Sequence, residues 1–282
     1  MATEAQLLGG NDIRELAARL DVVPTKKLGQ NFVTDPNTIR RIVAAAKLTG
    51  KETVVEIGPG LGSLTLGLIE VANKVISVEI DPKMAAAIEA TVALRAPGAD
   101  FTLVSADAMK VTDLGSAPDA LVANLPYNIS VPVLLHFLEQ FPSLHSGLVL
   151  VQAEVAHRLA AKPGNKVYGV PSLKLAWYAD ANLAGNVGRT IFWPIPNVDS
   201  ALVYFEKRAV ALGDESLRLA VFEAVDAAFS QRRKTLRQAL ADWAGSAAAA
   251  EQILVAAGVD PQKRGEQLDI HDFVRIAQAN GF

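Results

Sequence analysis

Between residues 53 and 152, five short apolar runs rich in β-branched residues alternate with stretches of helical periodicity. The runs are TVVEIG (53–58), KVISVEI (74–80), FTLVSAD (101–107), ALVANLP (120–126) and GLVLVQ (147–152). Predicted helices such as 63–72 and 82–94 separate them. Nearly continuous apolar strands with helices between them indicate a parallel sheet that is covered on both faces. We therefore predict an α/β fold.

The pattern changes after residue 180. Residues 181–207 are predicted to form two further strands joined by a proline-rich bend, and from about residue 210 the pattern is wholly helical. We divide the chain into an N-terminal extension (1–25), an α/β domain (26–209) and a small helical domain (210–282). In the extension, Asp12-x-x-Glu15 predicts a short helix that begins with a capping box.

The composition excludes several kinds of chemistry. The chain contains no cysteine, so disulfides, thiolate zinc sites and cysteine nucleophiles are ruled out. Its four histidines are scattered without a pair at ligand spacing, and we expect no metal site. No apolar run reaches transmembrane length and the N-terminus does not resemble a secretory signal, so a cytoplasmic location is expected. The net charge of −3 argues against a uniformly basic surface but not against a local basic cluster.

A glycine-rich loop, EIGPGLGSLT (56–65), follows the first predicted strand and leads into a helix. Glycines at 58, 60 and 62 allow the backbone to approach a ligand closely. Glu79 ends the second strand 21 positions after Gly58, a spacing typical of a carboxylate that binds ribose hydroxyls. A simple tight turn and a dinucleotide site remain as alternatives. However, the Gly-x-Gly-x-Gly spacing, with Glu56 two positions ahead, resembles motif I of class I S-adenosylmethionine-dependent methyltransferases.

Asp107 ends the third predicted strand and Ala108 follows it. In class I methyltransferases an acidic residue at this place holds the adenine amine of the cofactor, so the resemblance implies that role for Asp107. A helix N-cap or a turn aspartate is the alternative interpretation.

The segment Asn124-Leu125-Pro126-Tyr127 follows the fourth strand, at the sheet edge that carries the glycine loop. The N6 amine of adenine is a weak nucleophile because its lone pair is delocalised into the ring. The Asn124 side-chain oxygen and the Leu125 carbonyl are suited to draw its hydrogens out of the ring plane. Pro126 stiffens the turn, and Tyr127 offers a face on which a base can stack. A plain turn is the alternative interpretation.

Taken together, these motifs resemble the KsgA (RsmA) family of small-subunit rRNA adenine dimethyltransferases from about Lys26 to about residue 270. The matching segments are KKLGQNFVTD (26–35), EIGPGLGSLT (56–65), SVEID (77–81), Asp107-Ala108-Met109, NLPYNIS (124–130), QAEVAHRL (152–159), Tyr168-Gly169, PNVDSALV (196–203) and FSQRRKTLRQAL (229–240). The resemblance implies a class I methyltransferase fold, Rossmann-like, with a mostly parallel seven-stranded sheet and a small C-terminal helical domain.

The same resemblance implies roles for individual residues. Those assigned to the cofactor S-adenosylmethionine are Gln30, Asn31, Val33, Glu56, Gly58, Gly60, Glu79, Ile80, Asp107, Ala108 and Asn124. Those assigned to catalysis are Asn124, Leu125, Pro126, Tyr127 and Phe192, the last of which is expected to pack against a flipped-out base. The implied reaction is dimethylation of the N6 amines of two adjacent adenines in the 3′-terminal hairpin of 16S rRNA. The implied partner is an immature small (30S) ribosomal subunit.

A basic cluster in the segment 229–240 is the predicted RNA contact. It comprises Arg232, Arg233, Lys234 and Arg237, which we expect on one helix. Their role is to position RNA through its phosphates without reading its sequence. A solvated basic face is the alternative.

Three other functions are weighed against this hypothesis. An Erm-type 23S rRNA adenine methyltransferase would share the cofactor and adenine motifs. A mainly non-catalytic ribosome assembly factor would keep the fold alone, and a nicotinamide-dependent dehydrogenase would need affinity for NAD. We expect the protein to be a monomer.

Overall fold

The computed structural model describes residues 4–21 and 31–282. Its contacts divide the chain into two compact units. Unit 1 comprises Met1–Ala156 and Leu183–Lys207, and unit 2 comprises His157–Asn182 and Arg208–Phe282. The second unit is therefore larger than the helical domain expected from residue 210, because the segment His157–Asn182 joins it.

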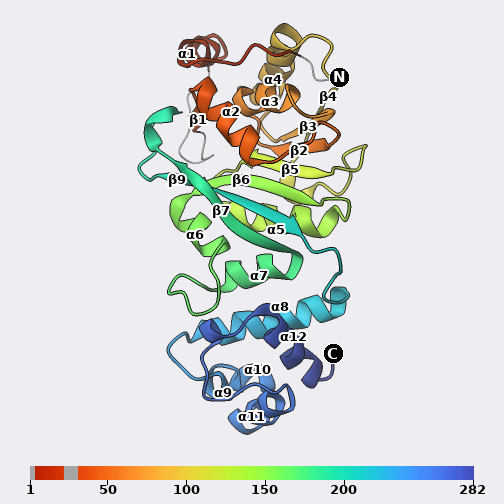
Figure 1. Ribbon diagram of the computed structural model, residues 1–282, viewed down its shortest axis with the longest axis vertical. Helices are drawn as coiled ribbons and strands as arrows, with labels where there is room; N and C mark the ends of the chain where they lie inside the picture. Colours follow the sequence, from red (N-terminus) through yellow and green to blue (C-terminus); the bar gives the residue numbers. More distant parts are fainter. Residues whose placement is uncertain (1–3, 22–30) are drawn as a thin grey trace. The chain divides into compact units, whose positions relative to one another are not determined.

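A seven-stranded sheet runs in the order β4-β3-β2-β5-β6-β9-β7 (Figure 1). The strands are β2 (Thr53–Ile57), β3 (Lys74–Glu79), β4 (Phe101–Ser105), β5 (Ala120–Asn124), β6 (Ser146–Gln152), β7 (Ala179–Val187) and β9 (Ser200–Lys207). Strands β2 to β6 pair in parallel, and β9 pairs antiparallel to β6. The mostly parallel seven-stranded α/β sheet is confirmed. A separate antiparallel pair joins β1 (Phe32–Val33) to β8 (Phe192–Trp193).

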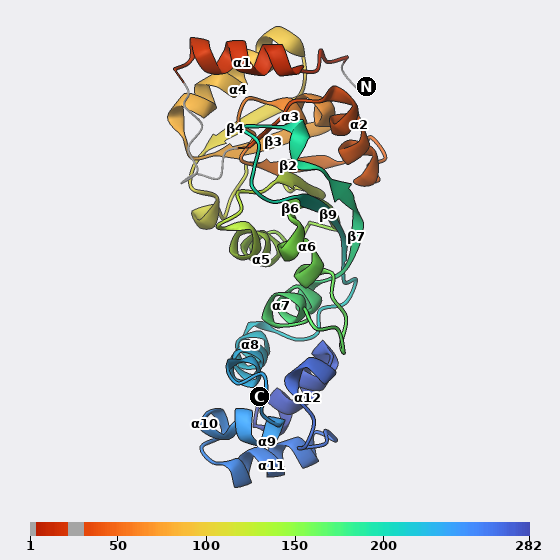
Figure 2. The ribbon, with the colours of Figure 1, turned by 90° about the vertical axis from the view of Figure 1, so that its left-hand side faces the viewer.

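Helices lie on both sides of this sheet, as two perpendicular views show (Figures 1 and 2). They are α1 (Gly10–Arg19), α2 (Pro36–Ala45), α3 (Ser63–Ile69), α4 (Pro82–Arg95), α5 (Ser130–Gln140) and α6 (Ala153–Leu159). Asp35 and Asp81 cap α2 and α4, each followed by a proline at the first helical position. The predicted capping box is shifted, because Asp12 lies at the third helical position and accepts from the Gly9 amide at 2.8 Å.

The central strands are buried on both faces, as their apolar composition predicts. In β2, β3, β5 and β6 nearly every side chain is buried, and β6 leaves no space even for a methyl group at Gly147. There a Cβ would stand 2.4 Å from the Leu121 carbonyl oxygen. Because the middle of each strand is enclosed, ligands can approach only at the strand ends.

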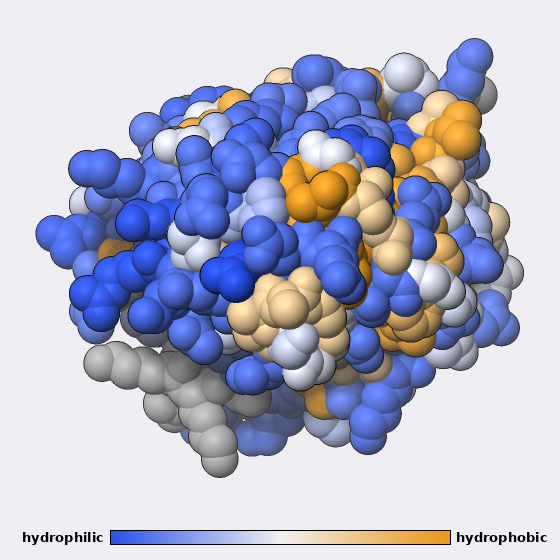
Figure 3. Space-filling model, turned by 90° about the horizontal axis from the view of Figure 1, so that it is seen from below, coloured by the Kyte–Doolittle hydropathy of each residue, from blue (hydrophilic) through white to orange (hydrophobic). Residues whose placement is uncertain are grey.

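Unit 2 is helical. Its helices are α7 (Val170–Tyr178), α8 (Glu215–Ser230), α9 (Leu236–Ala239), α10 (Ala241–Ala244), α11 (Ala247–Ala256) and α12 (Ile270–Ala279). Leu236, Leu254 and Phe273 are fully buried and join α9, α11 and α12 into one core. The face of the molecule drawn in Figure 3 is mostly hydrophilic on its left side, and its hydrophobic residues gather at the centre and right of the view.

The prediction of one continuous helix over 229–240 is wrong. Helix α8 ends at Ser230, a turn follows, and α9 starts only at Leu236. The Leu236 amide donates to the Lys263 carbonyl at 2.7 Å, and the Arg237 amide donates to the Pro261 carbonyl at 3.1 Å. The break turns Leu236 and Leu240 into the core, where both are fully buried, so tertiary burial outweighs helical propensity here.

Candidate cofactor and acceptor site

The glycine loop lies between β2 and α3 at the carboxyl edge of the sheet. Gly58, Gly60 and Gly62 have φ values of 68°, 57° and 97°, a left-handed conformation that side-chain-bearing residues rarely adopt. A Cβ at Gly60 would stand 2.7 Å from the Phe32 ring, and one at Gly62 would stand 2.6 Å from Ile88 Cδ1. The left-handed backbone therefore favours glycine at 60 and 62, and a side chain at either position would also displace Phe32 or Ile88.

Glu56 lies beneath this loop, with 1% of its surface exposed. One of its carboxylate oxygens, Oε2, accepts from Thr65 Oγ1 at 2.6 Å and from Ser77 Oγ at 2.8 Å. Burial raises the pKa of Glu56 to about 7, the two hydroxyls lower it, and the nearby charge of Glu79 raises it further. The carboxyl group is therefore largely neutral in mildly acidic solution.

This shift predicts how stability depends on pH. The folded-state pKa of about 7 lies above the ordinary 4.5, so Glu56 favours the folded state most below pH 4.5 and loses that contribution as the pH rises through 7. In Glu56→Gln the side-chain amide oxygen can still accept hydrogen bonds from the hydroxyls of Thr65 and Ser77. We expect wild-type stability to fall by up to about 3 kcal/mol relative to Glu56→Gln between pH 5 and pH 8.5. Urea unfolding of both proteins at several pH values measures this change. A stability difference between wild type and Glu56→Gln that stays constant with pH would contradict the prediction.

Polar and apolar groups from four strand ends meet around one pocket. Glu79 ends β3 with 7% of its surface exposed, and its Oε1 accepts from the Asp81 amide at 2.9 Å. Burial raises the pKa of Glu79, while hydrogen bonds from backbone amides lower it. The Ile80 side chain is 61% exposed, although it is apolar. Asp107 follows β4 and caps a short 3-10 turn (Ala108–Lys110), accepting from the Met109 amide at 3.0 Å.

The structure brings most of the residues assigned to the cofactor together around this pocket. Its lining comprises Asn31, Phe32, Val33, Glu56, Ile57, Gly58, Pro59, Gly60, Ser63, Leu64, Val78, Glu79, Ile80, Asp81, Met84, Ala106, Asp107, Ala108, Asn124, Pro126 and Ile129. Every residue assigned to the cofactor lies there except Gln30, which is outside the described residues. Sequence reasoning missed Ser63, which follows the glycine loop directly, and Met84 and Ile129, which reach the pocket only through packing.

The pocket suits S-adenosylmethionine in its chemistry. A buried carboxylate at Glu79 is a suitable acceptor for ribose hydroxyls, and the exposed Ile80 offers an apolar surface for a flat ring. Ser63 Oγ is buried in the pocket wall and has no hydrogen-bond partner among the described residues. Such an unpaired hydroxyl is costly unless a ligand or water satisfies it.

The Asn124–Tyr127 segment begins at the end of β5. Asn124 and Pro126 line the same pocket, whereas Leu125 and Tyr127 are not among its lining residues. Asn124 Nδ2 donates to the Asn31 carbonyl at 3.0 Å, which identifies Oδ1 as the acceptor atom of that side chain. Leu125 is buried, and its amide donates to the Leu150 carbonyl at 3.1 Å. The Tyr127 hydroxyl lies 2.9 Å from Ser200 Oγ, and burial raises the pKa of Tyr127, so the phenol stays neutral.

Phe192 is not brought to this pocket. It is 2% exposed and belongs to the hydrophobic core, where it pairs with Val33 across the β1–β8 ladder. Its neighbour Trp193 stacks on Phe32, with ring centroids 6.2 Å apart. Side chains alternate along a strand, so the residue next to Phe192 necessarily points the other way.

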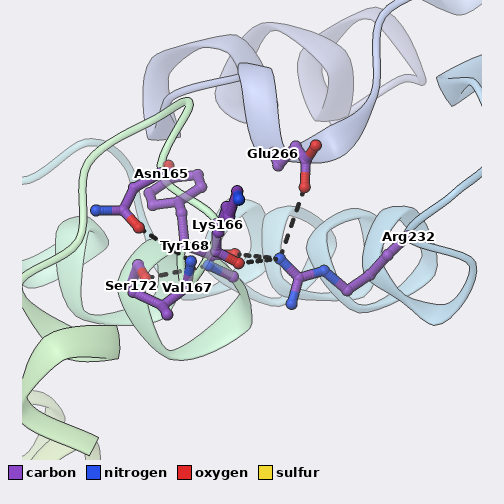
Figure 4. A network of polar contacts seen from close by, with 8 residues as sticks. Asn165, Lys166, Val167, Tyr168, Ser172, Arg232 and Glu266 are labelled. Atoms are coloured by element: carbon purple, nitrogen blue, oxygen red, sulfur yellow. Dashed lines mark hydrogen bonds and ion pairs between the residues drawn. The ribbon is translucent and has the colours of Figure 1, made fainter. Parts of the chain in front are cut away.

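The four basic residues predicted to contact RNA lie in unit 2, and their side chains make different contacts. Arg232 Nη2 donates to the carbonyls of Lys166 and Tyr168, at 3.1 and 2.9 Å, and lies 3.6 Å from the Glu266 carboxylate (Figure 4). Arg237 forms an ion pair of 2.7 Å with Glu251. Arg233 and Lys234 are exposed in the turn after α8.

These contacts predict different effects for two adjacent arginines. Arg232→Ala leaves two backbone carbonyls without their donor, and we expect the free energy of unfolding to fall by about 1–2 kcal/mol. Arg233→Ala removes an exposed cation and is expected to leave stability unchanged. If Arg233 meets an RNA phosphate, its loss lowers the slope of log affinity against log salt by about 0.7–0.9. Urea unfolding and salt titration of RNA binding measure both variants; equal stability losses would contradict the assignment.

Among the residues that the structure describes, no helix is long and apolar enough to cross a membrane. Within residues 4–21 and 31–282, no group of three or more histidine, aspartate or glutamate side chains is arranged to hold a metal ion.

Comparison with known proteins identifies the family. The model of the ribosomal RNA adenine dimethylase family matches residues 24–280. The chain belongs to the ribosomal RNA adenine dimethylase family. Its cofactor is S-adenosylmethionine, and the protein is an rRNA adenine dimethyltransferase.

Curated relatives cover almost the whole chain. The ribosomal RNA small subunit methyltransferase A of Arthrobacter sp. (strain FB24) is 61% identical over 277 residues, covering 98% of this chain and 94% of the relative. The protein of the same name from Streptomyces coelicolor is 61% identical over 279 residues, covering 98% of both.

Solved structures agree on the fold. A dimethyladenosine transferase from Plasmodium falciparum superposes with a TM-score of 0.74 at 24% identity, covering 87% of this chain and 95% of that one. The 23S rRNA methyltransferase ErmE superposes with a TM-score of 0.66 at 24% identity, covering 88% and 99%. Both share the fold of this chain, so the fold alone does not distinguish between rRNA targets.

Proposed function

We propose that this dimethyltransferase modifies the N6 amines of two adjacent adenines in the 3′-terminal hairpin of 16S rRNA within an immature small ribosomal subunit. The names of the curated relatives support the small subunit as the target. The observation that carries the site assignment is the position of Asn124. Its side chain lines the same pocket as Glu79, and its Nδ2 donates a hydrogen bond to the Asn31 carbonyl.

Each residue of the acceptor segment, Asn124–Tyr127, has a distinct task in this proposal. Asn124 Oδ1 and the Leu125 carbonyl accept the hydrogens of the adenine amine, which moves the nitrogen lone pair out of conjugation with the ring. Pro126 fixes the direction of that carbonyl, and Tyr127 stacks against the base. S-adenosylmethionine, when bound, supplies the electrophilic methyl group. The methylated amine is acidic and loses its proton to water, so the residues act mainly by positioning and electrostatics.

Glu79, Ile80 and Asp107 hold the cofactor in this proposal. The buried carboxylate of Glu79 accepts from ribose hydroxyls, and Asp107 accepts from the adenine amine. Ile80 packs against the adenine ring. Glu79 ends β3, Ile80 follows it, and Asp107 comes shortly after β4, so all three lie at the sheet edge where the Asn124–Tyr127 segment also lies.

The RNA is positioned through its phosphates by the exposed Arg233 and Lys234. Lys263 and Arg264 are exposed on the loop that the α9 amides contact, so they extend the same cationic region. These side chains carry no base-reading geometry, and specificity is left to the shape of the assembling subunit.

The test is methyl transfer to purified ribosomal particles. Small and large subunits from a strain that lacks the enzyme are incubated with the protein and labelled S-adenosylmethionine. We expect label in the small subunit, recovered as N6,N6-dimethyladenosine at two adjacent positions near the 3′ end of 16S rRNA by mass spectrometry. Label in 23S rRNA would indicate an Erm-type enzyme instead. Subunit binding without label would indicate an assembly factor.

A further inference from the structure

Helix α1 in the N-terminal extension is anchored to the end of α4 by both polar and apolar contacts. Asp12 Oδ1 accepts from Arg95 Nη2 at 2.7 Å, and Arg95 is the last residue of α4. The Arg95 carbonyl accepts from the Gln6 amide at 2.9 Å, which satisfies a helix-end carbonyl that α4 cannot pair internally. Ile13 and Ala17 are buried in the core of unit 1. Figure 2 shows α1 alongside α4.

Helix α4 in turn contacts the glycine loop. Ile88 and Thr91 approach Gly62 so closely that a Cβ there would stand 2.6 Å from Ile88 Cδ1 and 3.3 Å from Thr91 Cγ2. The N-terminal end of α4 also follows Glu79–Asp81 directly, with Asp81 as its N-cap. A shift of α4 would therefore move two walls of the cofactor pocket together.

The start of α1 lies against the segment that forms a third wall of the cofactor pocket. A Cβ at Gly10 would stand 3.7 Å from the Thr34 Cβ, so α1 lies against the segment that continues from Asn31 and Val33. Thr34 is itself fixed, because its amide and its hydroxyl both donate to the Ile191 carbonyl at 2.8 Å. One short helix thus touches both α4 and the segment opposite the glycine loop.

We propose that α1 is a brace for the cofactor pocket, and that the Asp12–Arg95 pair positions α4 for binding of S-adenosylmethionine. The inference rests on the cofactor site proposed above. Both side chains are partly buried, at 35% and 23% exposure, so solvent screens the pair less than an ion pair on the open surface. Asp12 and Arg95 are positioning residues, because neither lines the pocket.

The test compares three variants of the full chain. Arg95→Ala removes the ion pair, and Arg95→Lys keeps a cation within reach of Asp12. Arg19→Ala removes a basic side chain from α1. Arg19 lines a pocket between α1 and α4 together with Asp12 and Arg95, but it forms no ion pair among the described residues. Calorimetric titration with S-adenosylhomocysteine, without RNA, gives the affinity independently of which RNA is the substrate. The Michaelis constants for S-adenosylmethionine and for the RNA are then measured for the same variants.

We expect Arg95→Ala to weaken S-adenosylhomocysteine binding about three- to tenfold and to raise the Michaelis constant for S-adenosylmethionine alike. The Michaelis constant for RNA stays unchanged, Arg95→Lys recovers most of the loss, and Arg19→Ala behaves as wild type. Unchanged affinity in Arg95→Ala, or an equal rise of both Michaelis constants with no recovery in Arg95→Lys, would overturn the brace. If no ribosomal particle is methylated but the affinities follow this order, the substrate assignment fails and the brace stands.

Discussion

Asn124→Ala is expected to reduce methyl transfer by about 10²- to 10³-fold, the size of effect seen when one preorganised stabilising group is removed from an active site. The reason is the loss of Oδ1, which in the proposed mechanism is the side-chain acceptor that draws a hydrogen of the adenine amine out of the ring plane. The Asn124 amide is held by the Asn31 carbonyl at 3.0 Å, so in the native protein this acceptor is preorganised. Single-turnover transfer to small subunits measures the rate of the chemical step directly.

The control for this variant is Asn73→Ala. Asn73 is exposed just ahead of β3, at the opposite end of the strands from the pocket. We expect its single-turnover rate to equal that of wild type. Subunit affinity should be retained in both variants, because the proposed phosphate contacts lie in unit 2. A rate within threefold of wild type in Asn124→Ala would remove this residue from the catalytic machinery.

Glu79→Gln is expected to weaken S-adenosylhomocysteine binding by about 10- to 100-fold. A charged acceptor contributes about 1.5–3 kcal/mol to its hydrogen bonds, and the amide keeps the shape while losing the charge. The amide oxygen can still accept from the Asp81 amide, so the turn is expected to remain. Titration calorimetry measures the affinity. Glu89→Gln, an exposed glutamate on α4, serves as the matched control and should bind like wild type.

The same variant offers a second readout. The charge of Glu79 is one of the causes that raise the pKa of Glu56. Removing it lowers the pKa of Glu56, so the fall in stability with rising pH moves to lower pH in Glu79→Gln. If affinity and the pH profile both match wild type, Glu79 has no role in the pocket.

Sequence patterns predict the sheet and the pocket well, for a physical reason. Buried parallel strands require continuous apolar runs, and the residues directly after those runs are the ones that ligands can reach. Glu79 and Asn124 end such strands, and Gly58 and Asp107 come shortly after them, so position along the chain translates directly into position in space.

The remaining features depend on tertiary contacts that a pattern does not carry. Phe192 is buried because its two-residue strand pairs with β1, more than 150 positions earlier. The helix predicted over 229–240 breaks because α9 hydrogen-bonds to a loop near Pro261. Arg232 looks like its neighbour Arg233 in the sequence, yet only Arg232 is positioned to cap the carbonyls of Lys166 and Tyr168.

The anchoring of Asn124 has a consequence for how many times one nitrogen is modified. A freely rotating amide would reorient when the substrate changes from a primary to a secondary amine and offers one hydrogen fewer. The Asn124 side chain cannot exchange its oxygen and nitrogen without losing the bond to Asn31, so its acceptor keeps one direction through successive turnovers. In the proposed mechanism, Asn124 therefore presents the same acceptor to both transfers. The second transfer differs from the first in two ways: the amine already carries a methyl group, and only one of the two acceptors still receives a hydrogen.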